Sequence, residues 1–208
     1  MNTALRGLYV ITDNRLTPHD RLQECVEQAL RGGAGIVQYR DKHSNAVTRL
    51  EEANALNRLC RDYDALFIVN DDLPLARKCA AHGVHLGRDD DVLASARDFL
   101  GPDYIIGASC YNRMDLAEEA VKTGADYIAF GRFFPSGTKP DAVQADMALL
   151  QQARALNVPI CAIGGITEAN AASLIAAGAD MIAVVEGVFG QPDITAAAAR
   201  LASLFATP

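Results

Sequence analysis

The chain has 208 residues, 26 acidic against 19 basic side chains and a formal net charge of −7, which argues against a nucleic acid partner. Its five cysteines are scattered and form no C-x-x-C pair, which argues against a disulfide framework and against a zinc site. No apolar stretch approaches the roughly 20 residues of a membrane span, and the first residues lack the apolar core of a signal peptide, so we expect a cytoplasmic protein without a membrane partner.

Eight short apolar runs alternate with eight segments of helical periodicity. The runs cover residues 8–11, 36–37, 66–69, 83–84, 104–106, 127–130, 160–163 and 181–185, and the helical segments cover residues 20–30, 47–60, 74–81, 93–100, 114–122, 147–156, 168–177 and 194–205. Each run ends in residues suited to chemistry. Buried parallel strands with polar residues at one end are typical of a barrel with its active site there. We therefore expect an α/β fold in which residues 1–208 form a single (β/α)8 TIM-barrel domain.

The second run leads into Gln38, Tyr39, Arg40, Asp41 and Lys42. Because strand side chains alternate between two faces, Gln38, Arg40 and Lys42 can project to one side. An amide followed by two cations suits a polar ring that carries a diphosphate, since arginine offers a planar fork and lysine a compact charge. A solvated loop with ordinary charges is the alternative interpretation.

Acidic residues follow the next two runs. Asn70, Asp71 and Asp72 close the third run, and residues 89–91, all aspartate, come shortly after His85 at the fourth. Because neighbouring strand ends lie close together in a barrel, one carboxylate from each group could share a divalent cation such as Mg²⁺. Helix capping explains the same acids without a metal. His85 is open to two interpretations, proton transfer or packing at the barrel rim.

The loops after the sixth to eighth runs carry signals for anion binding. The sixth run leads into a Pro/Gly loop with two hydroxyls and an ammonium, from Ser136, Thr138 and Lys139, although turn chemistry explains its prolines and glycines. Gly164-Gly165 and Glu186-Gly187 follow the last two runs, where barrels commonly hold a phosphate with backbone N–H groups.

Together, these residues resemble the thiamine phosphate synthase family. Seven landmarks occur in family order over nearly the whole chain: residues 8–13 (LYVITD), 38–42 (QYRDK), 70–71 (ND), 83–87 (GVHLG) followed by Asp90, 107–109 (GAS), 134–139 (FPSGTK) and 163–166 (IGGI). The resemblance implies a (β/α)8 barrel that joins a hydroxymethylpyrimidine diphosphate to a thiazole phosphate and releases diphosphate and thiamine phosphate. It implies Mg²⁺ as the cofactor and these two small molecules as the partners.

The resemblance also assigns roles by matching position. Asp71 and Asp90 would bind Mg²⁺, and the residues that would bind the substrates are Gln38, Tyr39, Arg40, Asp41, Lys42, Asn70, Ser109, Ser136, Gly137, Thr138, Lys139 and Gly165. Among them, Arg40, Lys42, Ser109 and Lys139 would act in catalysis. Three positions depart from the family pattern: Arg88 replaces a frequent Gln, Ser136 a frequent Thr, and Glu186 a frequent Ser beside the thiazole phosphate.

An electron-rich aminopyrimidine can stabilise a cation at its exocyclic methylene, so diphosphate can leave before the thiazole nitrogen attacks. Catalysis is then mainly positioning and charge neutralisation, and needs no general base. A thiazole tautomerase, a catalytically silent metabolite-binding paralogue and a phosphosugar isomerase are the alternatives. The first two have no need of the acids or of the residue 38–42 cluster, and an isomerase would normally require an acid/base pair. A homo-oligomer is compatible with the sequence, which does not define the oligomeric state.

Overall fold

The computed structural model describes residues 5–87, 90–135 and 143–206. The strands are β1 (Gly7–Ile11), β2 (Ile36–Tyr39), β3 (Leu66–Asn70), β4 (Gly83–Leu86), β5 (Ile105–Tyr111), β6 (Tyr127–Gly131), β7 (Ile160–Ile163) and β8 (Met181–Val184). The helices are α1 (Leu22–Arg31), α2 (Ala46–Asp62), α3 (Leu73–Lys78), α4 (Asp90–Leu100), α5 (Met114–Lys122), α6 (Ala148–Ala153), α7 (Glu168–Ala176), α8 (Glu186–Phe189) and α9 (Ile194–Ser203), with a 3-10 turn, η1 (Arg154–Leu156), after α6.

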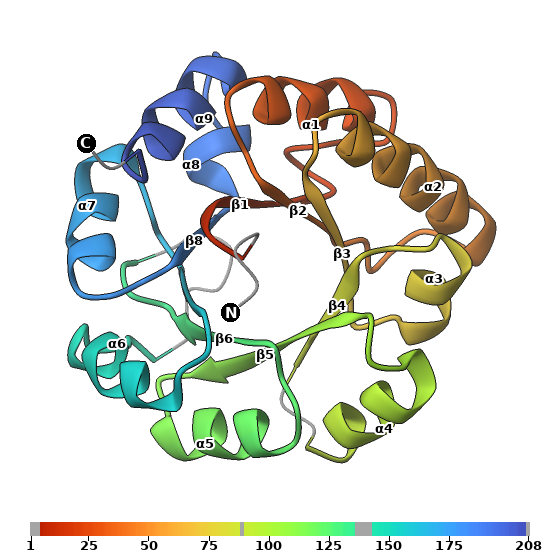
Figure 1. The fold of residues 1–208 in the computed structure, drawn as a ribbon. Coiled ribbons are helices and arrows are strands. Elements are labelled where there is room, and N and C mark those ends of the chain that lie inside the picture. Colours follow the sequence, from red (N-terminus) through yellow and green to blue (C-terminus); the bar gives the residue numbers. More distant parts are fainter. Residues whose placement is uncertain (1–4, 88–89, 136–142, 207–208) are drawn as a thin grey trace.

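The eight strands form one closed barrel in chain order, and β8 pairs in parallel with β1. The helices form a ring around the barrel, so that every strand is covered on its outer face (Figure 1). Closure leaves no strand edge unpaired, and each parallel connection is made by the helix that follows its strand. The expected (β/α)8 barrel is confirmed.

Alternation along the strands separates two apolar cores. Leu8 and Val10 belong to the larger core, between the strands and the helix ring, whereas Tyr9 and Ile11 belong to the smaller one inside the barrel. The same period of two holds on the other strands, because successive side chains point to opposite faces of a sheet. An inward-facing residue near the carboxyl end of a strand therefore faces the mouth of the barrel.

Two elements differ from the expected ones. β5 does not end near residue 106 but continues to Tyr111, which places Ser109 inside the strand, facing the barrel interior. Gly107 lies within this strand, and the Tyr127 ring of β6 fills the space that a side chain at Gly107 would take. The short helix α8, which follows β8, was not among the expected helical segments. Among the described residues, no helix has both the length and the hydrophobicity needed to span a membrane.

Candidate active site

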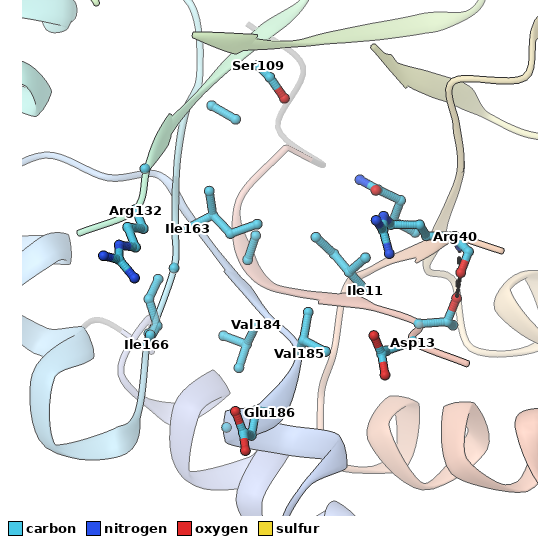
Figure 2. A pocket seen from close by; sticks show the side chains of 18 of the residues that line it. Ile11, Asp13, Arg40, Ser109, Arg132, Ile163, Ile166, Val184, Val185 and Glu186 are labelled. Carbon is cyan, nitrogen blue, oxygen red and sulfur yellow. Dashed lines mark hydrogen bonds between the residues drawn. The ribbon is translucent and has the colours of Figure 1, made fainter. Parts of the chain in front are cut away.

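A cavity of about 350 Å³ opens at the carboxyl ends of the strands. Every strand or the loop that follows it contributes to its lining, which includes Ile11, Asp13, Gln38, Arg40, Asn70, His85, Ser109, Tyr111, Gly131, Arg132, Ile163, Gly165, Ala183, Glu186 and Gln191. In Figure 2, Arg40 and Asp13 lie on one side of the cavity, and Arg132 and Ile166 lie on the opposite side. This is the end of the barrel at which the polar strand endings predicted an active site.

Gln38 and Arg40 both line the cavity, as expected for alternate residues of β2. The backbone of Arg40 is held by β1, because its N–H donates to the Thr12 hydroxyl over 2.9 Å. Lys42 is not among the lining residues, and its ammonium lies 3.7 Å from the Asp71 carboxylate. The structure thus brings two members of the predicted cation cluster to the cavity and places the third beside the acids that follow β3.

Tyr39 and Asp41 lie on the other face of β2 and do not line the cavity. The Tyr39 hydroxyl donates to Glu52 over 2.6 Å, and Asp41 accepts hydrogen bonds from Asn14 over 2.9 Å and from the His43 N–H over 2.8 Å. Tyr39 thus contacts α2, and Asp41 contacts the loop after β1. The assignment of these two residues to substrate binding stays a prediction.

Asp41 is expected to contribute to stability. Burial opposes its ionisation, but hydrogen bonds from Ser44, the His43 N–H and Asn14 prevail and hold its pKa well below the usual range. A lowered folded pKa gives stability that is complete above the unfolded pKa of about 4 and is lost as the pH falls through the folded pKa. Asp41→Asn should therefore lower the free energy of unfolding at pH 7 by about 1.5–3 kcal/mol, and the difference should shrink below pH 4.

Urea unfolding of Asp41→Asn at pH 7 and at pH 3 measures both effects. Asp103→Asn is the matched control, because Asp103 is exposed and its carboxylate accepts no hydrogen bond from the described residues. Wild-type stability together with a raised KM for Asp41→Asn would contradict the structural role and support substrate binding by Asp41.

The three residues after β3 have different surroundings. Asp72 accepts from the Leu75 N–H over 2.8 Å at the start of α3 and pairs with Arg49 over 2.7 Å, so it is the helix cap. Asp71 has a φ of +60°, and its half-exposed carboxylate accepts from Asn70 over 2.6 Å. Capping therefore accounts for Asp72, and metal binding by Asp71 stays a prediction.

The surroundings of Asp71 fit a magnesium ion in donor chemistry. One carboxylate oxygen of Asp71 faces Gly87, whose Cβ, if present, would lie 3.9 Å from it. Gly87 directly follows β4, and Asp90 begins α4 three residues later, so both predicted ligands come from adjacent strand ends. Carboxylate oxygens are the ligands that this hard cation prefers.

A second group of metal-ligating side chains lies away from the cavity. Ligand atoms of His19, Asp41 and Glu52 all lie within 4.8 Å of one another. The His19 Nδ1 is 2.6 Å from a Glu52 oxygen, whereas the other Glu52 oxygen accepts from Tyr39. Glu52 raises the pKa of His19 through this hydrogen bond. Ion pairing and hydrogen bonding explain this group as a structural element that joins the chain before α1 to α2.

Gly164 and Gly165 allow the loop after β7 to pack against the loop after β6. Both have positive φ, +103° and +64°, which disfavours other residues. A Cβ on Gly164 would lie 2.3 Å from the Arg132 Cβ, and one on Gly165 would lie 2.3 Å from the Pro135 carbonyl oxygen. The two glycines therefore bring these loops into contact on one side of the cavity, where a phosphate site was predicted.

Some predicted residues lie outside the described part of the chain. These are Arg88 and the loop residues Ser136, Gly137, Thr138 and Lys139, together with the side chain of Asp90. Other cavity residues were not assigned to the site from the sequence, namely Asp13, His85, Arg132, Glu186 and Gln191. Four of them lie near the carboxyl end of a strand or in the segment directly after it, which is the signal that could have found them, whereas Gln191 follows α8. Glu186 begins α8 and brings a carboxylate to the cavity edge (Figure 2).

A closed parallel barrel with amide, hydroxyl and guanidinium groups around a cavity at the strand ends defines a (β/α)8-barrel enzyme. A family model described as thiamine monophosphate synthase matches residues 8–188. The chain therefore belongs to the thiamine monophosphate synthase family.

Individual relatives agree with this family. The chain is 54% identical over 202 residues to the thiamine-phosphate synthase of Thioalkalivibrio sulfidiphilus, which covers 97% of this chain and 96% of the relative. It is 55% identical over 202 residues to that of Marinobacter nauticus, covering 96% and 91%. A solved thiamine phosphate pyrophosphorylase from Pyrococcus furiosus superimposes with a TM-score of 0.87 at 37% identity and covers 97% of this chain and 96% of its own.

Proposed function

We propose that this chain joins a hydroxymethylpyrimidine diphosphate to a thiazole phosphate, with formation of thiamine phosphate and release of diphosphate. The observation that carries the proposal is the identity of 54% and 55% to two thiamine-phosphate synthases over nearly the whole chain. The cavity supports it, because Gln38, Arg40, Asn70 and Ser109, four of the residues assigned to substrate binding, line it.

In the proposed reaction, the bond between the exocyclic methylene carbon and a diphosphate oxygen breaks, and its electron pair leaves with the diphosphate. The thiazole nitrogen then donates its lone pair to the same carbon. Arg40, Lys42 and Lys139 bind the departing diphosphate, and Gln38 and Asn70 hold the pyrimidine ring. Positioning and charge neutralisation supply the rate enhancement, and no side chain has to remove a proton.

Asp71 and Asp90 would hold Mg²⁺, which when bound supplies positive charge next to the diphosphate. Lys42, 3.7 Å from Asp71, adds a further positive charge at the same strand end. Ser136, Thr138, Lys139 and the backbone at Gly165 would hold the thiazole phosphate. Arg40 and Gly165 both line the cavity, so the two substrates would meet within it.

The test is a reaction of the purified chain with both substrates and Mg²⁺, followed by diphosphate release and by chromatography of thiamine phosphate. Product is expected only when both substrates and the metal are present, and chelation with EDTA should abolish it. Conversion of the thiazole phosphate alone would instead identify a tautomerase. Tight binding of the thiazole phosphate without turnover would identify a silent paralogue, and either result would overturn the proposal.

A further inference from the structure

A line of hydrogen-bonded polar side chains crosses the barrel interior below the cavity. Gln38 donates through Nε2 to the Tyr9 hydroxyl over 2.7 Å, and that hydroxyl is 2.9 Å from the Tyr127 hydroxyl. The Tyr127 hydroxyl is 2.9 Å from His85 Nδ1, and His85 Nε2 is 2.9 Å from the Ser109 hydroxyl. Both tyrosines are fully buried, whereas the ends of the line, at Gln38 and Ser109, reach the cavity.

Packing holds the rings of this line in place. A Cβ on Gly107 would lie 2.0 Å from the Tyr127 ring, so the ring occupies the space in which β5 has no side chain. The His85 ring stacks on Tyr127 with centroids 5.6 Å apart, and Tyr9 meets Tyr127 edge-on at 6.2 Å. Because protein interiors are close-packed, these rings cannot turn to other hydrogen-bond partners without displacing their neighbours.

Counting the available donors shows that each hydrogen bond between Gln38 and His85 is donated in the direction of His85. Tyr9 accepts from the Gln38 amide, and the other partner of its hydroxyl among the described residues is Tyr127, so Tyr9 donates to Tyr127. Burial raises the pKa of both tyrosines, which keeps their protons in place. Tyr127 then donates to His85 Nδ1. A neutral imidazole that accepts at Nδ1 carries its proton on Nε2.

The same count sets the direction of the Ser109 hydroxyl. His85 Nε2 donates to the Ser109 oxygen, so the serine's own proton is directed away from His85, and Ser109 lines the cavity. We propose that Tyr127, held by Tyr9, is a positioning residue that keeps His85 in its Nε2–H tautomer and thereby makes Ser109 a hydrogen-bond donor to the substrate. The proposal rests on the proposed function, because the departing diphosphate would supply the acceptor oxygen for Ser109. A donor aimed at developing negative charge assists departure.

The histidine tautomer can be measured in the protein without substrate by ¹⁵N NMR at pH 8. The expected spectrum of the wild-type protein shows the Nε2–H form for His85, whose signal is identified by its loss in His85→Asn. His82 is an internal reference, because its Nδ1 accepts the Phe67 N–H over 2.9 Å and therefore requires the same form. In Tyr127→Phe, His85 should show both tautomers while His82 is unchanged. An Nδ1–H form of His85 in the wild-type protein would overturn the proposal.

Kinetics test the consequence at Ser109. Tyr127→Phe is expected to lower kcat about tenfold with little change in KM, because one oriented hydrogen bond is lost. Tyr63→Phe, which removes a hydroxyl bonded to Glu27 and Arg31 on the outside of the barrel, should match the wild-type protein. In Ser109→Ala, the added Tyr127→Phe change should have no further effect on kcat, because the two residues act through one hydroxyl. Additive losses would indicate a merely structural role for Tyr127 and would overturn the proposal.

The two tests separate this inference from the proposed function. Absence of thiamine phosphate with the wild-type protein would refute the proposed function, whereas the His85 tautomer would still be measured. Conversely, normal wild-type activity together with an Nδ1–H form would refute only the role of the tyrosines.

Discussion

Arg40→Ala is expected to lower kcat/KM for the pyrimidine diphosphate by about 100- to 1,000-fold. Arg40 is the cation of β2 that faces the cavity, and its backbone is held by the Thr12 hydroxyl, so its guanidinium starts from a defined position. A planar guanidinium can form two charge-assisted hydrogen bonds to one phosphate group, and these strengthen as charge moves onto the leaving diphosphate. Initial rates of diphosphate release, with each substrate varied in turn, measure the loss.

Two further variants test whether the loss of kcat/KM comes from the guanidinium of Arg40 or from the change in net charge. Arg40→Lys keeps the positive charge but not the planar guanidinium, so its kcat/KM should lie between those of the alanine variant and the wild-type protein. Arg15→Ala removes the same charge from an exposed position that does not line the cavity, and it should leave kcat/KM unchanged. If Arg15→Ala and Arg40→Ala were equally impaired, the effect would come from net charge, and Arg40 would have no specific role.

Asp71→Asn is expected to lower turnover about 100-fold or more at millimolar Mg²⁺ and to raise the Mg²⁺ concentration needed for half-maximal activity. The change removes one negative charge from a hard-cation ligand while keeping the shape of the side chain. Asparagine tolerates the positive φ of +60° at this position, so the backbone conformation should not change. Isothermal titration with Mg²⁺ and a magnesium dependence of diphosphate release together measure both effects.

Asp64→Asn is the matched control for this variant. Asp64 precedes β3 and Asp71 follows it, and both are aspartates with positive φ, +53° and +60°. Because they lie at opposite ends of one strand, the same substitution at Asp64 tests the backbone and charge effects away from the cavity. Near-normal turnover of Asp71→Asn across magnesium concentrations would refute its role as a metal ligand.

The residues in and directly after β2 show what the local sequence pattern can predict. Alternation along a strand correctly separates Gln38 and Arg40, which line the cavity, from their neighbours. Matching positions to a family does not make this separation, so Tyr39 and Asp41 were grouped with the substrate ligands, although Tyr39 bonds to α2 and Asp41 to the loop after β1. The period of two is a property of the backbone, and it is therefore the stronger guide to where a side chain points.

The role of His85 shows what the local sequence pattern cannot predict. Its position at a strand end is visible in the sequence, yet its role depends on Tyr127, 42 residues away, and through Tyr127 on Tyr9. In the sequence both tyrosines belong to apolar strand runs typical of core packing. Their hydroxyls meet only because barrel closure brings inward-facing residues of β1, β4 and β6 together across the interior.

By itself, the sequence determined the succession of eight strands and helices, the end of the barrel that carries polar groups, and the family. These depend on periodicity and on residues close together in the chain, which a linear pattern contains. The tertiary structure alone decided which acid caps α3, which side chains of β2 face the cavity, and the hydrogen-bonded line from Gln38 to Ser109. Those properties depend on distances between residues far apart in the chain, and closure of the barrel sets these distances.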